Sequence, residues 1–209
     1  MTPLTKLQPV LRGGSVHLIP LKEEHFPELI KLSKDKRIWE FYVLDGTDEK
    51  RFSGTLHDAL MESERGNQFP FVIYHKAGKK IIGSTRFMDI QRAHKKLEIG
   101  WTWLHPDFWG TEVNYECKLL LLTFCFENLK TLRVQLKTDA NNLRSRRAIE
   151  KIGGQFEGIL RNDMLRDNGT IRNSAYYSVL DSEWSALKPK LERMCENKRE
   201  AYSPGSRLP

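Results

Sequence analysis

A short loop with a single glycine contains the first residues of this sequence that could do chemistry. It reads Trp109-Gly110-Thr111-Glu112-Val113-Asn114 and separates a predicted strand from a predicted helix. A helix begins with unpaired backbone N–H groups at the positive end of its dipole, and glycine lets a ligand come close to the main chain. The loop therefore favours a site for an anion such as phosphate; a simple strand-to-helix turn is the alternative.

A second polar loop leads into a basic helix. Asn142 stands three residues before Ser145, a spacing at which the Asn142 side chain can cap the start of the helix. Four cations and one acid follow within eight residues: Arg144, Arg146, Arg147, Lys151 and Glu150. Guanidinium groups suit phosphate oxygens, although a solvent-facing helix surface is the alternative for each arginine taken singly.

Composition limits the class of protein. Of the 209 residues, 39% are hydrophobic and 29% are charged, so the chain can bury one core and need not be disordered. The net charge of +7 suits nucleic acid, a phosphate-bearing cofactor or an acidic protein as partner, or else a solvated basic surface. The basic helix has no interleaved aromatic residues, which makes nucleic acid the least favoured partner.

Other classes of protein are disfavoured by the cysteines, the histidines and the apolar runs. The three cysteines and six histidines show no ligand spacing, so we expect neither a disulfide scaffold nor a metal site. No apolar run approaches the ~20 residues of a membrane span, and residues 1–6 lack the apolar segment of a signal peptide. We therefore expect a cytoplasmic protein that does not cross a membrane.

Hydrophobic periodicity predicts the elements that position the two loops. Three sequential strands followed by two helix–strand units predict a mixed sheet with helices on both faces, an α/β (α+β) fold. The predicted strands are 16–20, 69–75, 80–90, 97–104, 133–138, 155–166 and 171–180, and the predicted helices are 22–34, 48–65, 111–129, 143–152 and 181–199. Residues 12–15 are expected to form a turn, and residues 201–209 a frayed tail.

The strand at 97–104 has a clean alternation that would place its residues on two faces. One face would present Leu97, Ile99, Trp101 and Trp103, and the other Glu98, Gly100 and Thr102. The aromatic segment 39–42 is expected to belong to the core, with the lining of an acceptor pocket as its alternative. Cys117 and Cys125, two turns apart on a leucine-rich helix, are expected to fill the core.

The stretch from Glu98 to Gly153 resembles the acetyl-CoA-binding half of the GNAT N-acetyltransferase superfamily. More narrowly, it is similar to the RimJ/RimL type, which acetylates N-terminal amines of ribosomal proteins. The motifs that carry the resemblance are Glu98-Ile-Gly-Trp101, His105-Pro-Asp-Phe-Trp-Gly110 and Asn142-Leu-Arg-Ser-Arg-Arg-Ala-Ile-Glu-Lys-Ile-Gly153. The resemblance implies a single GNAT domain over residues 1–184, followed by a C-terminal helix and tail at 185–209.

The implied fold is a mixed, mostly antiparallel sheet of six to seven strands, splayed between strands 97–104 and 133–138 at the acetyl-CoA site. By resemblance, the main chain of Trp101, Thr102, Trp103 and Leu104 would pair with pantetheine. The N–H groups of Gly110, Thr111, Glu112, Val113 and Asn114 would bind the pyrophosphate. Asn142 would contact the pantetheine arm, Ser145 would lie near the thioester sulfur, and Arg144 or Arg147 would meet a phosphate.

Three positions depart from the family pattern. Asp107 and Glu112 stand in the phosphate loop where the family has other residues, and a carboxylate beside a pyrophosphate is electrostatically unfavourable unless it points to solvent. Ile149 occupies the place at which many relatives have a tyrosine as general acid. These departures leave a non-catalytic CoA-binding or regulatory module as the second hypothesis.

The first hypothesis is an N-acetyltransferase that moves an acetyl group from acetyl-CoA to a primary amine by direct transfer in a ternary complex. The acceptor would be a protein N-terminus or a small amine, and pairing of two copies is left open. Glu98 is the candidate general base, with an exposed strand carboxylate as its alternative. Ser145 is the candidate proton donor to the leaving thiolate, with helix capping as its alternative.

Overall fold

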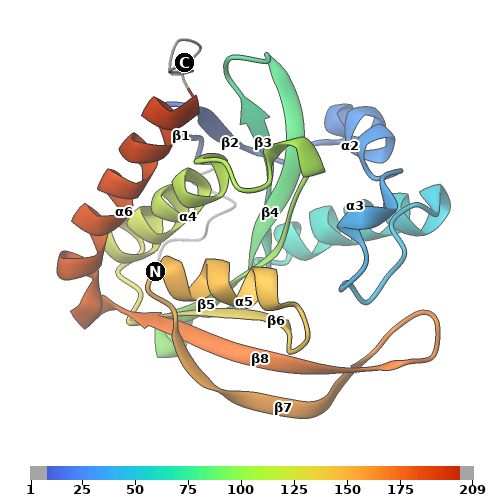
Figure 1. Ribbon diagram of the computed structural model, residues 1–209. Helices are drawn as coiled ribbons and strands as arrows, with labels where there is room; N and C mark the ends of the chain where they lie inside the picture. The colour runs from blue at the N-terminus through green and yellow to red at the C-terminus, as the bar shows by residue number, and fades with distance from the viewer. Residues whose placement is uncertain (1–8, 203–209) are drawn as a thin grey trace.

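Eight strands form one sheet in the order β1-β2-β3-β4-β5-β6-β8-β7 in the computed structural model, which describes residues 9–202 (Figure 1). Neighbouring strands are antiparallel except β5 and β6, which run parallel. The strands are β1 Leu11–Arg12, β2 Val16–Pro20, β3 Phe69–His75, β4 Lys80–Gln91, β5 Lys96–Leu104, β6 Arg133–Asp139, β7 Gln155–Leu165 and β8 Ile171–Leu180. The predicted α/β fold with a mixed, mostly antiparallel sheet is confirmed.

The sheet has one strand more than the six to seven expected. The additional strand, β1, has two residues and pairs Leu11 with Leu18 and Arg12 with His17. A strand of two residues is too short to produce an alternating pattern, so the sequence showed only the turn that follows it.

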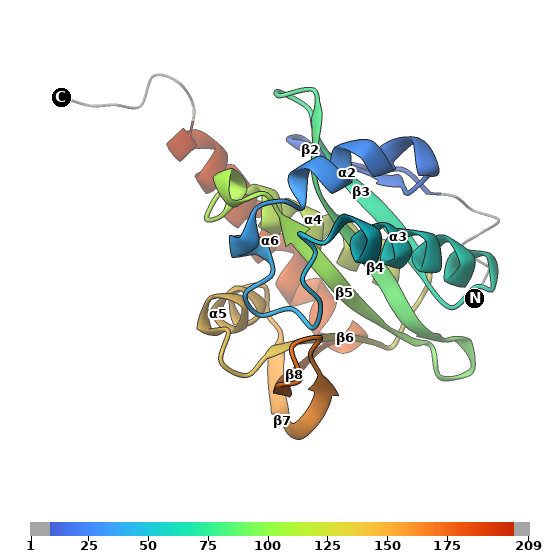
Figure 2. The same cartoon turned by 90° about the vertical axis from the view of Figure 1, so that its right-hand side faces the viewer.

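Helices cover both faces of the sheet (Figure 2). Helices α4 and α6 lie on one face, and α2 and α3 lie on the other. The five α-helices are α2 Phe26–Leu32, α3 Glu49–Glu64, α4 Val113–Thr123, α5 Leu143–Lys151 and α6 Asp181–Tyr202. Short 3₁₀ turns occupy Glu23–His25, Lys36–Ile38, Arg92–His94 and Pro106–Phe108, and a π-helical turn at Phe124–Asn128 continues α4.

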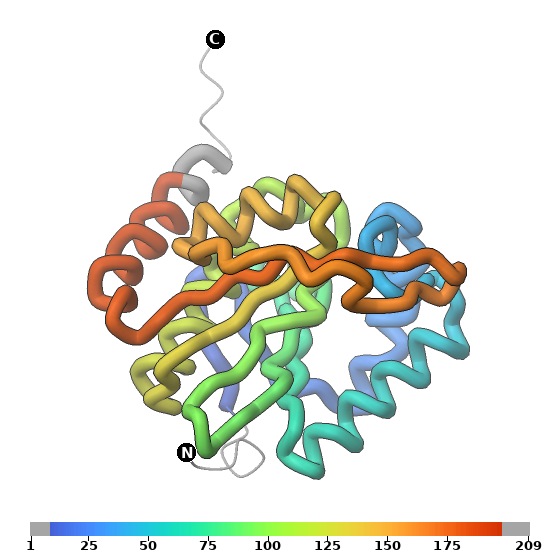
Figure 3. The backbone as a smooth tube through the Cα atoms, turned by 90° about the horizontal axis from the view of Figure 1, so that it is seen from below, coloured from blue at the N-terminus to red at the C-terminus, as the bar shows by residue number. Residues whose placement is uncertain are grey.

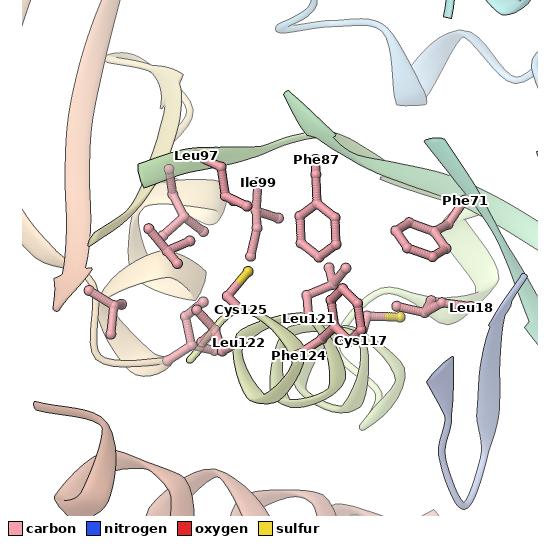
Figure 4. Packing of buried hydrophobic residues seen from close by; sticks show 14 of the residues in the cluster. Leu18, Phe71, Phe87, Leu97, Ile99, Cys117, Leu121, Leu122, Phe124 and Cys125 are labelled. Atoms are coloured by element: carbon pink, nitrogen blue, oxygen red, sulfur yellow. The ribbon is translucent and has the colours of Figure 1, made fainter. Parts of the chain in front are cut away.

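Helix α4 forms the main core against the sheet (Figure 4). Cys117 and Leu121 of this helix and Cys125 of the π-helical turn that follows it face Phe87 and Ile99 of the sheet, and all five side chains are buried. The two cysteines are therefore core residues, as the sequence predicted. The helix begins two residues later than expected, at Val113, because Thr111 belongs to the preceding turn.

A second core lies on the opposite face, beneath α3. Asp48 caps this helix by accepting a hydrogen bond from the backbone N–H of Arg51. Phe52 and Leu56 are buried in this core, whereas Met61 is 47% exposed. Met61 therefore lies outside the buried face of the helix.

The carboxylate of Glu116 on α4 is buried and holds the turn between β1 and β2 against the helix. Glu116 accepts hydrogen bonds from the backbone N–H groups of Gly14, Ser15 and Val16 at 2.6–2.9 Å. A Cβ at Gly13 would lie 2.7 Å from the Glu116 carboxyl carbon, so the turn requires glycine at this position. The β1–β2 turn and α4 are thereby held together.

The C-terminal elements complete the main core. Helix α5 ends at Lys151, and Gly153 shortly after it has a left-handed φ of +89°, a conformation at which helices commonly terminate. Helix α6 begins at Asp181, and its residues Trp184, Leu191 and Cys195 are buried. The boundary predicted at residue 184 thus falls inside a helix that packs into the same core. Of the frayed tail expected at 201–209, residues 203–209 lie outside the described residues, as do residues 1–8.

The β7–β8 hairpin crosses the molecule toward the α2–α3 connection (Figure 3). At its tip, the backbone N–H of Asp167 donates to the carbonyl oxygen of Val43 at 2.9 Å. The Asp167 carboxylate also forms an ion pair of 2.7 Å with Arg51 of α3. These contacts join two segments that are more than a hundred residues apart in the sequence.

Candidate active site

A cleft opens where β5 and β6 separate. The two strands pair at only three positions, Lys96–Glu98 with Arg133–Gln135, and β5 continues for six residues beyond the last of them. The space between them is a cleft of about 280 Å³, lined by both strands and by the loops that follow them. The splayed sheet that the sequence predicted is therefore confirmed.

A β-bulge at Trp101 shapes the wall of this cleft. Trp101 has a left-handed φ of +48°, and the β4–β5 register shifts between Ser84 and Arg86. The predicted alternation of 97–104 is consequently wrong after residue 100. Trp103 does not share a face with Leu97 but packs in the core beneath α3, while Leu104 joins the main core.

All four residues from Trp101 to Leu104 line the cleft. The backbone carbonyl of Thr102 accepts a hydrogen bond of 2.7 Å from the Tyr42 hydroxyl. Arg86 stacks on the Trp101 ring with its guanidinium carbon 4.6 Å from the ring centre. Burial lowers the pKa of Arg86 to about 10, and its Nε has no hydrogen-bond partner among the described residues.

The glycine loop contributes fewer groups than the sequence suggested. Gly110 has a φ of +77° and lines the cleft together with Asn114. Thr111, Glu112 and Val113 are absent from the lining. The Thr111 hydroxyl accepts from the backbone N–H of Val113 at 3.3 Å, and the Val113 side chain is buried in the main core.

The two carboxylates that depart from the family pattern stay out of the cleft. The Asp107 side chain is 69% exposed and lies 3.3 Å from His105 Nδ1. Glu112 is half-buried, and neither residue lines the cleft. Electrostatic repulsion of a phosphate group by these two residues is therefore limited.

The second loop places three predicted residues in the cleft wall. Asn142 accepts a hydrogen bond of 3.0 Å from the backbone N–H of Ser145 and so caps α5. Asn142, Arg144 and Ser145 all line the cleft. The Arg144 guanidinium lies 3.6 Å from the centre of the Trp109 ring, and Trp109 donates to the carbonyl of Leu104 at 3.0 Å.

Arg147 does not reach the cleft. It is exposed and absent from the cleft lining, because it follows Arg144 and Ser145 on the solvent-facing side of α5. Arg146 instead donates to the Tyr177 hydroxyl at 2.9 Å and holds α5 on the sheet. Of the two arginines that the sequence proposed for a phosphate, Arg144 lines the cleft and Arg147 does not.

Glu98 is a buried carboxylate rather than an exposed strand residue. It is 2% exposed and lines the cleft at the point where β5 and β6 separate. Its Oε2 accepts a hydrogen bond of 2.8 Å from Gln135 and lies 3.4 Å from the Lys137 ammonium. Burial raises the pKa of Glu98, and the charge of Lys137 acts in the opposite direction.

Among the cleft residues that the sequence did not identify are Lys118, Lys137 and Arg172, and Tyr42 lines the cleft as the alternative for its segment predicted. Lys118 donates to the Thr102 hydroxyl at 2.7 Å, and burial lowers the pKa of its ammonium to about 8. In the sequence, the position of this lysine inside the apolar stretch of α4 could have indicated that its side chain would be buried. Tyr42 belongs to the aromatic segment expected in the core, where Trp39 does lie.

This combination of a splayed sheet, a glycine loop before a helix and a capped basic helix matches one known family. The family model described as "Acetyltransferase (GNAT) domain" matches residues 15–155, about two-thirds of the chain. The chain belongs to the GNAT acetyltransferase family. It is accordingly an acyltransferase by family, and the resemblance seen in the sequence is confirmed.

Relatives and solved structures of the GNAT family agree with this assignment. "Putative ribosomal N-acetyltransferase YdaF" of Bacillus subtilis is 32% identical over 108 residues, covering 52% of this chain and 58% of that protein. A GCN5-related N-acetyltransferase from Brucella melitensis has a TM-score of 0.81 at 29% identity, covering 89% of this chain and 85% of that one. Mycobacterium smegmatis RimJ, solved in complex with CoA-disulfide, shares the fold, with a TM-score of 0.75 at 18% identity over 91% of this chain and 92% of that one.

Within residues 9–202, no helix is both long enough and apolar enough to cross a membrane.

Proposed function

We propose that this protein transfers the acetyl group of acetyl-CoA directly to a primary amine, with both substrates bound in the cleft between β5 and β6. The observation that carries the proposal is the separation of the two strands after Glu98, which opens the cleft. Holding two reactants in one site converts a bimolecular reaction into an effectively unimolecular one.

The donor end of the cleft offers groups that suit the coenzyme. Beyond Glu98, the edge of β5 that faces β6 has no strand partner among residues 9–202, so backbone groups there other than the Thr102 carbonyl can pair with the amides of pantetheine. Gly110 and Asn114 offer a glycine loop and a helix start for the pyrophosphate. Arg144, stacked on Trp109, adds a guanidinium for a phosphate group.

Glu98 is proposed as the general base at the acceptor end. An amine attacks only when it is neutral, and an α-amino group with a pKa near ~8 is mostly protonated at neutral pH. The buried Glu98 carboxylate can take that proton, directly or through a water, and its raised pKa makes it a stronger base. The ion pair with Lys137 favours the ionised form that this role requires.

Ser145 is proposed to assist departure of the thiolate. It lies in the cleft wall at the start of α5, and its backbone N–H is already used by the Asn142 cap, so the hydroxyl is the group that remains to act. Ile149, in the family's tyrosine position, has no proton to donate, although it also lines the cleft. Catalysis would thus combine one base, one hydroxyl donor and positioning.

The acceptor is proposed to be a protein N-terminus or a small amine. The name of the Bacillus subtilis relative, a ribosomal N-acetyltransferase, supports the first of these. Phe41, Tyr42 and Met164 also line the cleft and would contact a bound acceptor.

The experiment measures acetyl-CoA binding by calorimetry and then thiol release on a panel of amines. All three cysteines are buried, so a thiol reagent will report released CoA over a small protein background. Binding with turnover and an acetylated product by mass spectrometry is the expected result. Binding without turnover on any amine would favour the regulatory module. Salt-sensitive RNA binding without CoA affinity would overturn both readings.

A further inference from the structure

The β7–β8 hairpin contributes to the part of the cleft that we assign to the acceptor. Met164 of β7 and Arg172 of β8 line the same cleft as Phe41 and Tyr42. The bond between Asp167 and Val43 holds the hairpin tip over this end. Side chains of the hairpin are therefore placed to contact whatever amine enters.

Arg172 is a buried cation at this end. It is 9% exposed, and its Nε donates to the Ser174 hydroxyl at 3.1 Å. Within residues 9–202, no carboxylate lies at ion-pair distance from its guanidinium. A buried charge without a counter-charge lowers the stability of the fold, because the protein interior solvates it poorly.

The nearest acids already have partners of their own. Asp139 forms an ion pair with Arg166 and accepts a hydrogen bond of 2.8 Å from the backbone N–H of Asn141. Asp163 accepts a hydrogen bond of 3.2 Å from the Tyr176 hydroxyl. Both acids act on Arg172 at longer range, but burial still lowers the pKa of Arg172.

The other charges at this end do not compensate Arg172. Glu98 and Lys137 neutralise each other as an ion pair. Arg86 adds a second buried guanidinium behind Trp101, and it too has no carboxylate at ion-pair distance among the described residues. Arg172, Arg86 and Arg144 all act electrostatically on Tyr42, so the surroundings of this residue are cationic.

We propose that the preferred acceptor is a primary amine that also carries a carboxylate, and that Arg172 binds this carboxylate. The inference rests on the proposed acetyl transfer and names its substrate class. A charge-assisted, bidentate pair with the guanidinium would supply the missing counter-charge and orient the amine. A cationic acceptor such as a polyamine would meet repulsion at the same place. The carboxylate can come from a small amino acid or from an acidic residue near a peptide N-terminus.

The test compares acceptors that differ only in this charge. The peptide arm uses Ser-Asp-Ala amide against Ser-Asn-Ala amide, and the small-molecule arm uses β-alanine against β-alaninamide. Spermidine serves as the cationic acceptor. We expect kcat/KM to favour the acid over its amide by roughly tenfold or more, as hydrogen bonds to charged groups predict. The arm with the larger ratio identifies the source of the carboxylate.

The variants are Arg172→Gln, Arg172→Lys and the exposed hairpin control Arg161→Gln. Arg172→Gln should reduce the acid-to-amide ratio toward one, Arg172→Lys should restore part of it, and Arg161→Gln should leave it unchanged. Calorimetry with CoA on each variant checks that the fold is retained.

A wild-type ratio near one, or faster turnover of spermidine, would overturn this inference while leaving acetyl transfer intact. An equal loss on acids and amides in Arg172→Gln would also overturn it, because a structural role predicts that pattern. Failure of every acceptor would overturn the proposed function and this inference together.

Discussion

Lys118 donates a hydrogen bond of 2.7 Å to the hydroxyl oxygen of Thr102, at the wall of the cleft. The same hydroxyl lies 2.7 Å from that of Thr85, so a buried ammonium is solvated by a short chain of threonines. In the described part of the chain, no carboxylate lies at ion-pair distance from Lys118. A cation in this position should cost stability whenever it is ionised.

The first prediction concerns the pH dependence of that cost. The pKa of Lys118 falls from 10.5 to about 8 on folding, so the unfolded chain binds more protons between these values. Stability from this group therefore rises with pH across that window. Lys118→Met should be more stable than the wild type at pH 7, and its advantage should shrink by ~2 kcal/mol between pH 7 and pH 9.5.

Urea unfolding of both proteins at several pH values measures this difference. Lys190→Met, an exposed position on α6, is the control and should show no such trend. An advantage of Lys118→Met that is constant with pH would contradict the buried-ammonium interpretation.

The second prediction tests Glu98 as the base. Glu98→Gln keeps the shape and the hydrogen bond to Gln135 but cannot accept a proton, so turnover should fall by about 10²–10⁴-fold while CoA affinity is retained. Steady-state kinetics and calorimetry give the two values. Glu192→Gln, at an exposed site on α6, should behave as the wild type. Unchanged turnover in Glu98→Gln would remove Glu98 from the mechanism.

The third prediction concerns Lys137, the ion-pair partner of Glu98. A base must be ionised to act, so the rate should fall as pH falls through the pKa of Glu98, which burial raises above its ordinary value of 4.5. Lys137 opposes that rise by its charge. Lys137→Met should therefore move the acid limb of the kcat/KM profile to higher pH. An unmoved or downward-shifted limb would show that another group controls the profile.

The fourth prediction concerns Gly110. Its φ of +77° disfavours any other residue, although a Cβ there would meet no atom within 4 Å. Gly110→Ala should thus destabilise the loop by ~1 kcal/mol through the backbone alone and raise the KM for acetyl-CoA several-fold.

Gly169→Ala provides a matched control for this change. Gly169 has a φ of +79° and equally open surroundings, but it lies in the hairpin turn between β7 and β8. The two variants should lose similar stability in urea unfolding, and only Gly110→Ala should alter the KM for acetyl-CoA. A similar rise in both would mean that the effect is not local to the donor loop.

Much of the fold follows from patterns within short stretches of the chain. The Asn142 cap and the burial of Cys117 each depend on neighbours a few residues away, so the sequence predicted them correctly. The motifs around Glu98, at Gly110 and from Asn142 to Gly153 together indicated the cleft and the family.

What the sequence could not determine depends on contacts between distant elements. The bulge at Trp101 arises from the pairing of β5 with β4, which reverses the expected facing of Trp103. The backbone N–H of Val113 donates to the Thr111 hydroxyl in a local bond whose geometry only the folded loop fixes. These corrections concern orientation rather than the identity of the elements.

The sequence by itself determined most of the order of elements and the two loops that flank the cleft, because helix and strand periodicity and capping act over a few residues. Its motifs also resembled those of the family to which the chain belongs. The tertiary structure decided which charges meet in the cleft. Lys118 and Arg172 come from a leucine-rich helix and from the second strand of a hairpin, and neither position shows in the sequence that its cation will be buried. Burial is a property of packing across the sheet, and so the chemistry of the acceptor end became visible only when the chain was folded.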